Sequence, residues 1–253
     1  MSQASVWIRA RNRLLRISGR RPYRRMHGLN LRQPIVSFTF DDFPRSALHA
    51  AGPILKKYGC VGTYYASAGL MGKMEPSGEI FWREDLEVLL REGHELGCHT
   101  FHHYDAMLTL PGPFEASVIA NRKAFAELCP GVELRSFSYP LEDPHIGTKR
   151  AAGRHWLSCR AGGQTLNRQN IDLNSMRAFF IEQSGNRPEA IWQMIERNRE
   201  EHGWLIFATH DVSDHPTKYG CTPALFEEVV RRSVESGARI LTVGQACDLL
   251  LVA

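Results

Sequence analysis

Short apolar segments alternate with amphipathic segments along most of this chain, and this alternation limits the fold more than any other feature. The apolar segments have the length and the β-branched and aromatic content of strands. The segments between them have helical periodicity, and the one at 188–203 begins with proline and ends with glycine, as helices commonly do. Repeated strand–helix alternation indicates a parallel sheet with helical crossovers, either closed as a barrel or open and doubly wound. The expected strands are 35–40, 60–67, 94–100, 135–140, 155–162, 176–182, 204–211 and 239–244, and the expected helices are 47–59, 83–93, 113–129, 188–203 and 222–238.

Polar side chains follow most of the expected strands at the C-terminal end, which is where chemistry gathers in either architecture. Their types bind metals or move protons, so their common position indicates one functional face. These residues are Asp41, Asp42, His99, His103, Tyr139, Arg160 and His210.

The adjacent aspartates in "SFTFDDFP" (37–44) need a specific explanation, because neighbouring carboxylates repel. A helix N-cap would explain one of them but not both. A divalent ion explains both, since one aspartate can bind it while the other stays free as a base. Two imidazoles and one carboxylate form a facial ligand set that leaves positions open for water and substrate. The alternative for His99 and His103 is chance spacing, because the chain contains 11 histidines.

Three short motifs carry a family resemblance. "TFDD" (39–42), "HTFHH" (99–103) and "ATHD" (208–211) resemble the first, second and fifth motifs of the NodB-type polysaccharide deacetylases, carbohydrate esterase family 4. The resemblance extends from about residue 34 to 247 in motif order and spacing. It implies a distorted (β/α) barrel of seven or eight mostly parallel strands, the NodB homology domain. It also implies metal-dependent removal of acetyl groups from N-acetylated sugars.

The same resemblance assigns roles to individual residues. Asp41 would be the general base, and His210 the general acid. The metal ligands would be Asp42, His99 and His103, holding one divalent ion. We expect zinc, with cobalt, nickel, manganese and iron as alternatives. The oxyanion would be held by the metal and by the backbone N–H of Leu141, after the turn that Tyr139 begins, with Tyr139 and Leu141 facing the substrate.

The third motif departs from the commoner family form. Many members have Arg-Pro-Pro at the end of the fourth strand, with the arginine contacting the catalytic aspartate. Here the segment is "SFSYPLED" (136–143), with Ser138 at that place, and it resembles a Phe-x-Tyr-Pro subset. Arg160, which ends the next strand, is our candidate replacement, and Arg135 and Arg177 are weaker ones. The alternative for Arg160 is an ordinary surface ion pair. The fifth motif also has Ala208 where the family usually has leucine.

The segment after the expected acid, 211–223, is long and irregular, which is typical of a loop that contacts substrate. Asp214 and His215 within it could be further metal ligands, but a solvated loop is the simpler interpretation.

The charge is unevenly divided between two parts of the chain. Residues 1–33 contain nine arginines and no acidic residue, whereas 34–253 carries 22 basic against 27 acidic side chains, a net charge of −5. We therefore expect a basic arm at 1–33 and a catalytic domain at 34–253. Apolar residues among the arginines could place residues 1–25 on an anionic membrane surface, or the arm could pack on the domain. The acidic domain argues against a nucleic-acid partner.

The sequence thus predicts a metal-dependent carbohydrate N-deacetylase acting on a polysaccharide, a lipid-linked glycan or a precursor. Arginines interrupt the apolar runs near the N-terminus, which argues against a secretion signal. Six dispersed cysteines fit a reducing compartment. We therefore expect a cytoplasmic protein, peripheral at the inner membrane face. The motifs do not separate this activity from a deformylase or amidohydrolase acting on a lipid-linked amino sugar or small amide. A non-catalytic, membrane-associated binding protein is the alternative from another class.

Overall fold

The computed structural model describes residues 19, 22–141 and 143–252 of the chain. Most of the predicted basic arm lies outside these residues, so the proposed boundary at residue 33 is not tested. Where this region is described, it contacts the domain: strand β1 (Met26–Gly28) pairs antiparallel with β9 (Asn170–Asp172). Within the described residues, every helix is too short or too polar to span a bilayer.

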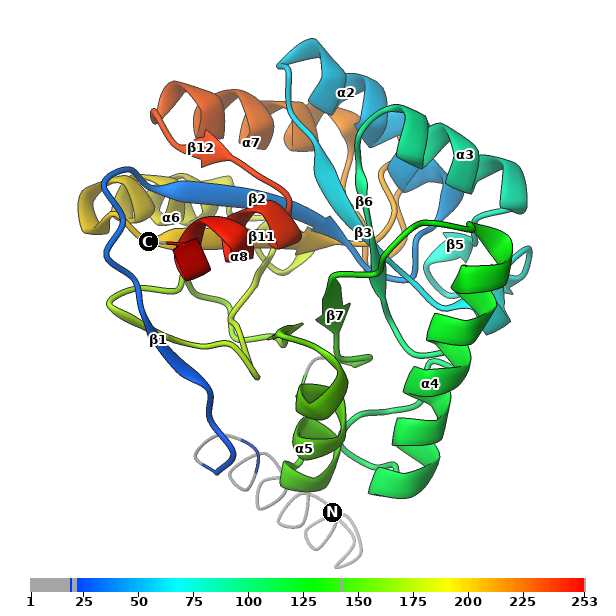
Figure 1. Cartoon of the computed structure of the whole chain (residues 1–253). Coiled ribbons are helices and arrows are strands. Elements are labelled where there is room, and N and C mark those ends of the chain that lie inside the picture. The colour runs from blue at the N-terminus through cyan, green and yellow to red at the C-terminus, as the bar shows by residue number, and fades with distance from the viewer. Residues whose placement is uncertain (1–18, 20–21, 142, 253) are drawn as a thin grey trace, which may run out of the picture.

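A curled sheet of eight parallel strands forms the centre of the fold (Figure 1). Seven strands follow one another in the order β10-β11-β2-β3-β6-β7-β8, and β12 pairs with the start of β2. The two ends of this path approach each other, because Arg160 on β8 forms a bridge with Met176, just before β10. The predicted distorted barrel of mostly parallel strands is therefore confirmed. The strands are β2 (Ile35–Phe40), β3 (Gly62–Ala66), β6 (Glu95–Cys98), β7 (Ser136–Ser138), β8 (Ser158–Arg160), β10 (Phe179–Phe180), β11 (Trp204–Thr209) and β12 (Arg239–Ile240).

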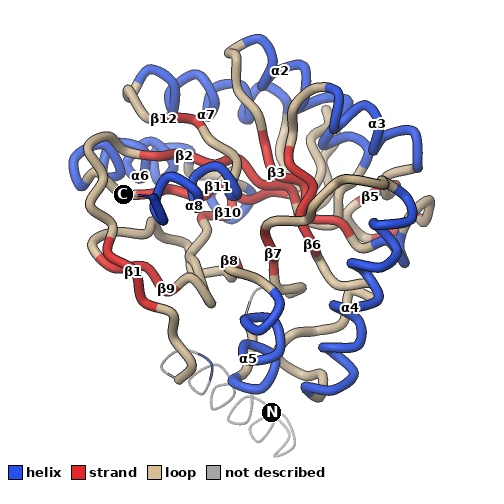
Figure 2. Tube along the Cα trace, viewed as in Figure 1, coloured by secondary structure: helices blue, strands red, loops and turns tan. Residues whose placement is uncertain are grey.

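Helices surround this sheet (Figure 2). Three of them begin at a proline, whose missing N–H and fixed φ suit the first helical position. They are α4 (Pro111–Leu128), α6 (Pro188–Glu201) and α7 (Pro223–Glu235). The others are α2 (Gly52–Lys57), which continues a π-helical turn at Ala47–Ala51, and α3 (Arg83–Arg91), α5 (Ile146–His155) and α8 (Val243–Val252).

The two faces of β2 show why this sequence forms a barrel strand. Val36, Phe38 and Phe40 pack in the larger apolar core with residues of the outer helices. Ser37 and Thr39 alternate with them and are buried on the opposite face, where Ser37 accepts a hydrogen bond from the indole of Trp204 at 3.0 Å. The small polar residues thus line the barrel interior, and the phenylalanines anchor the strand to the helices.

Several elements differ from the sequence expectations. The expected strand at 176–182 is reduced to β10, and the one at 239–244 is reduced to β12 and followed by the unexpected helix α8. The Glu95 carboxylate accepts a hydrogen bond from the N–H of Gly244, 149 residues away, at 2.8 Å. That contact caps the start of α8 from another part of the chain, which no local pattern reveals. A short hairpin, β4 (Met74–Glu75) and β5 (Gly78–Glu79), was also not expected.

Candidate active site

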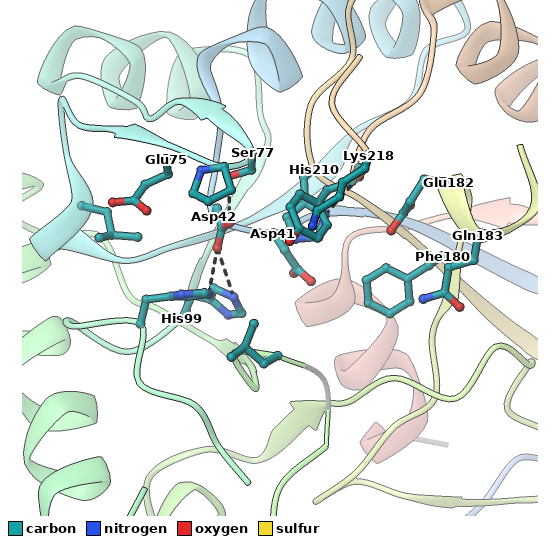
Figure 3. Close-up of a pocket in the computed structure, with 15 residues that line it drawn as sticks. Asp41, Asp42, Glu75, Ser77, His99, Phe180, Glu182, Gln183, His210 and Lys218 are labelled. Atoms are coloured by element: carbon teal, nitrogen blue, oxygen red, sulfur yellow. Dashed lines mark hydrogen bonds and ion pairs between the residues drawn. The ribbon is translucent and has the colours of Figure 1, made fainter. Parts of the chain in front are cut away.

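Both aspartates that follow β2 face one pocket (Figure 3). Asp41 continues the alternation of Ser37 and Thr39 and is therefore directed into the barrel. Asp42 would point to the outer face if the strand continued, but its φ is 62° and that of Phe43 is 56°. Two successive residues other than glycine in the left-handed region are rare and strained. This turn of the backbone directs the second carboxylate into the same pocket as the first.

Asp41 is held by Arg160 and Ser138 beneath the pocket. The Arg160 guanidinium donates to Asp41 Oδ1 and to Ser138 Oγ, and Ser138 Oγ lies 3.3 Å from Asp41 Oδ1. Arg160 is fully buried between the rings of Tyr65 and Phe180, whose centroids lie 5.2 and 5.5 Å from the guanidinium carbon. Burial alone raises the pKa of the Asp41 carboxyl, but Arg160 and nearby imidazoles outweigh it and hold this pKa below its usual range. The predicted contact between Arg160 and Asp41 is present, and a surface ion pair is excluded for Arg160.

Asp42, His99 and His103 form a cluster whose ligand atoms all lie within 4.8 Å of one another. Asp42 Oδ1 lies 3.6 Å from His99 Nε2 and 3.0 Å from His103 Nε2. The other carboxylate oxygen, Oδ2, accepts a hydrogen bond from Ser77 Oγ at 2.9 Å, and Ser77 is buried in the β4–β5 hairpin. Ser77 therefore leaves Oδ1 directed at the two imidazoles.

The donor set of this cluster fits a divalent metal ion. His99 Nδ1 lies 2.9 Å from the backbone carbonyl of Ser138, which can only accept, so Nδ1 carries the proton. The lone pair of His99 Nε2 then faces the carboxylate oxygen Oδ1 of Asp42. Two acceptors that face each other repel, and a cation bound between them would remove this repulsion. A histidine oriented by a carbonyl at its other nitrogen is typical of metal sites.

Burial and charge shift the titration of these groups. Burial lowers the pKa of His99 to about 4, which keeps its imidazole neutral as a ligand requires. Burial raises the pKa of the Asp42 carboxyl, but the hydrogen bond and charge of His103 outweigh it, so this pKa lies below its usual range. Burial lowers the pKa of His103, but the hydrogen bond and charge of Asp42 outweigh burial, so the pKa of His103 lies above its usual value.

His210 follows β11 on the other side of the two carboxylates and also lines the pocket (Figure 3). Its Nδ1 lies 3.2 Å from the backbone carbonyl of Tyr219, so Nδ1–H donates and Nε2 is the nitrogen available to a substrate. The ring lies between those of Phe180 and Tyr219, at centroid distances of 6.4 and 5.4 Å.

The pocket has a volume of about 460 Å³, within the usual range for small-molecule sites. Six of its lining residues were predicted from the sequence. These are Asp41, Asp42, His99, His103, Leu141 and His210. No lining residue from the β4–β5 hairpin or from the end of β10 was predicted from the sequence, and the loop after His210 was predicted as a substrate contact without its pocket-lining residues being named. These further lining residues are Glu75, Pro76, Ser77, Phe180, Glu182, Gln183, Lys218 and Tyr219, and Leu70 completes the lining.

Two predicted substrate contacts are placed differently. Leu141 lines the pocket in a left-handed conformation with φ 59°. Tyr139 does not line it, because its side chain is buried in the core and its hydroxyl donates to the carbonyl of Asn174 at 3.0 Å. The prediction that the Tyr139 side chain faces the substrate is therefore corrected. Tyr139 only begins the turn that presents Leu141. Among the described residues, Asp214 and His215 do not join the ligand cluster.

The polysaccharide deacetylase family model matches residues 28–152 of the chain, nearly half of it. The match contains the first two motifs and ends before the strand that carries His210. The predicted resemblance to the NodB-type deacetylases is therefore confirmed, while the Phe-x-Tyr-Pro subset remains a prediction. No curated protein matches the chain in sequence.

Solved structures share this fold at low sequence identity. A structure described as T48 deacetylase with substrate is 18% identical with a TM-score of 0.57, over 84% of this chain and 90% of that one. The family 4 carbohydrate esterase from Streptomyces lividans, in complex with acetate, is 16% identical with a TM-score of 0.55, over 81% and 91%. BA3943 from Bacillus anthracis, a family 4 pseudoenzyme, is 13% identical with a TM-score of 0.59, over 88% and 66%. These likenesses identify the fold as a NodB-type distorted barrel.

Proposed function

We propose that this protein is a metal-dependent hydrolase that removes the acetyl group from an N-acetylated sugar. The observation that carries the proposal is the separation of roles around one pocket. Asp42, His99 and His103 form a metal-ligand cluster, whereas Asp41 is anchored independently by Arg160. The resemblance to polysaccharide deacetylases and the T48 and Streptomyces lividans structures support the same reaction class.

Amide hydrolysis needs an attacking water, an acceptor for its proton, a site for the oxyanion and a proton for the leaving amine. A divalent ion at the cluster, with zinc the metal we propose for its nitrogen ligands, supplies a Lewis acid that lowers the pKa of water and polarises the amide carbonyl. Asp41 accepts the proton of the attacking water, since Arg160 keeps its carboxylate ionised. The N–H of Leu141 donates to the oxyanion. His210, in its doubly protonated form, donates the Nε2 proton to the departing nitrogen while its Nδ1–H stays bonded to the Tyr219 carbonyl.

The substrate we propose is an amino sugar in a lipid-linked glycan or glycan precursor, at the cytoplasmic face of a membrane. The nine arginines of residues 1–33 support contact with an anionic surface. The intact set of Asp41, Asp42, His99, His103 and His210 argues against a non-catalytic binding protein, although BA3943 shows that the fold includes pseudoenzymes.

The test is product release from a panel of N-acetylated and N-formylated amino sugars by the metal-loaded protein. Acetate release supports the deacetylase, and release of formate alone would favour the deformylase. The matched control is His103→Ala, which removes one ligand. We expect elemental analysis to show near-stoichiometric metal in the wild type and little in the variant. Equal metal in both proteins, or no release of either acid, contradicts the proposal.

A further inference from the structure

The loop at 211–221 is tied directly to His210. The carbonyl oxygen of Tyr219 lies 3.1 Å from the backbone N of His210 and 3.2 Å from its Nδ1. One carbonyl therefore accepts from both donors and fixes the backbone and the ring of His210 together. The position of Tyr219 thus decides which nitrogen of His210 carries the proton and where the ring points.

The Asp211 carboxylate holds the turn that carries this carbonyl. Asp211 is 4% exposed, and its Oδ2 accepts from the backbone N–H of Thr217 at 2.7 Å. Its Oδ1 accepts from the Thr217 hydroxyl at 2.5 Å, and that hydroxyl in turn accepts from the backbone N–H of Tyr219 at 3.2 Å. A chain of hydrogen bonds therefore runs from Asp211 through Thr217 to the residue that orients His210.

Gly220 closes the loop onto Asp211. The backbone N–H of Gly220 donates to Thr217 O at 3.1 Å, and that of Cys221 donates to Asp211 O at 3.0 Å. A Cβ on Gly220 would lie 2.2 Å from Asp211 Oδ1 and 2.3 Å from the backbone oxygen of Asp211, so no larger residue fits without moving both groups. The two ends of the loop are thus packed in direct contact at the carboxylate, whereas Asp214 and His215 at its tip are exposed to solvent.

We propose that Asp211 and Thr217 are positioning residues that act through the Tyr219 carbonyl to hold His210 with Nδ1 protonated and Nε2 facing the substrate. This inference rests on the proposed role of His210 as general acid. We call the hydrogen-bond chain from Asp211 through Thr217 to Tyr219 the brace. Without it, the imidazole can rotate or exchange tautomers, and Nε2 loses its alignment with the leaving nitrogen. Misplacement of a catalytic group by about 1 Å can cost about 100-fold in rate.

The test uses Thr217→Val, which keeps the side-chain shape and removes the hydroxyl. Thr217→Ser restores the hydroxyl, and Asp211→Asn is a second disruption of the same brace. Asp214→Asn is the matched control, because Asp214 is an exposed acidic residue of the same loop. Two measurements are made on the full-length, metal-loaded proteins. The first is the imidazole ¹⁵N spectrum, with His210 assigned by its loss in His210→Gln. The second is the kinetics on an N-acetylated amino sugar and on 4-nitrophenyl acetate, whose leaving group needs no proton.

We expect Thr217→Val to lower kcat on the acetamide about 10- to 100-fold with little change in KM. Hydrolysis of the activated ester should fall less than about threefold, because protonation of its leaving group is not required. In spectra recorded on the neutral imidazole, His210 should change from a single Nδ1-protonated tautomer to a mixture of tautomers. Thr217→Ser and Asp214→Asn should behave as the wild type does.

Equal losses on the amide and the ester would overturn the positioning role, because they indicate general damage to the site. An unchanged His210 spectrum in both Thr217→Val and Asp211→Asn would overturn it as well. If the wild type releases no acid from any amino sugar, the proposed function fails. The ¹⁵N spectra still decide whether the brace holds His210.

Discussion

Arg160 and Asp41 form a buried ion pair although three strands, β3, β6 and β7, lie between their own strands in the sheet. Neighbouring strands lie about 4.8 Å apart, so a flat sheet would separate these two residues by about 19 Å. Curling of the sheet brings them together across the barrel interior. The contact therefore depends on the closed shape of the barrel as well as on the two residues.

Replacing Arg160 tests this ion pair. Because Arg160 lowers the pKa of Asp41, Arg160→Met should raise it, and the acidic limb of the pH–rate profile should move to higher pH. Methionine can pack between Tyr65 and Phe180, so we expect the circular dichroism spectrum and the metal content to be retained. The rate at neutral pH should fall. An unchanged acidic limb would mean that Arg160 does not control the ionisation of Asp41.

The two aspartates should give different losses when each is changed to asparagine. Asp41→Asn should keep the metal and lose about 100-fold or more in kcat, because the amide cannot accept a proton from water. Asp42→Asn should weaken metal binding itself, because a ligand charge is lost. Metal titration by calorimetry and steady-state kinetics measure the two effects. Exchanged phenotypes would reverse our assignment of base and ligand.

Ser77→Ala tests the support of the metal ligand Asp42. Loss of the 2.9 Å hydrogen bond frees the carboxylate to rotate, and we expect metal affinity to fall about 10- to 100-fold. Competition with a chelator measures this affinity without any assay of activity. Ser46→Ala is the control, because the Ser46 side chain makes no capping hydrogen bond at the turn that it precedes. Equal affinities for the two variants would show that Asp42 is oriented by other contacts.

Asp85 supports stability away from the pocket. Its carboxylate accepts from the backbone N–H of Trp82 at 2.8 Å and from Arg45 Nε at 2.8 Å, and it lies 2.7 Å from His49 Nε2. Asp85→Asn should lower the free energy of unfolding at pH 7 by about 1–2 kcal/mol, as measured by urea denaturation. The exposed Glu84 provides the control Glu84→Gln, for which we expect almost no change.

The pH dependence of this loss has a definite sign. Burial raises the pKa of Asp85, but the bonds from Trp82, Arg45 and His49 outweigh it and leave the folded-state pKa below its usual value. The stabilisation is therefore present above the unfolded-state pKa of about 3.9 and is lost as the pH falls through the folded-state pKa. The wild type and Asp85→Asn should converge in stability in acid. A difference that stays constant down to pH 2 would contradict this explanation.

Local sequence patterns were sufficient for the strand-end residues of the site. Parallel strands place their C-terminal ends at one edge, so finding Asp41, His99 and His210 after separate strands was enough to predict that they meet. Arg160 could be predicted for the same reason. The resemblance to NodB-type deacetylases then supplied the expectation of a barrel, which alternation alone left open.

Other parts of the site depend on contacts that no local pattern contains. Ser77 comes from a hairpin whose strands are two residues long, too short to show any periodicity. The group that orients His210 is the backbone carbonyl of Tyr219. Every residue has such a carbonyl, so the residue type at 219 does not reveal this contact. The Tyr139 side chain was misplaced because a strand-end position does not say which face a side chain occupies.

The left-handed turn at Asp42 and Phe43 also limits which changes evolution or a mutant library can sample at the metal site. Asparagine, aspartate and glycine tolerate this backbone conformation, whereas a β-branched residue does not. A substitution at position 42 must therefore fit this backbone conformation before its side chain can serve as a metal ligand. A glutamate with the same charge would first have to adopt a main-chain conformation that it rarely takes. A change of metal preference is consequently easier to reach by substituting a residue that supports the ligands, such as Ser77 beside Asp42, than by replacing Asp42 itself.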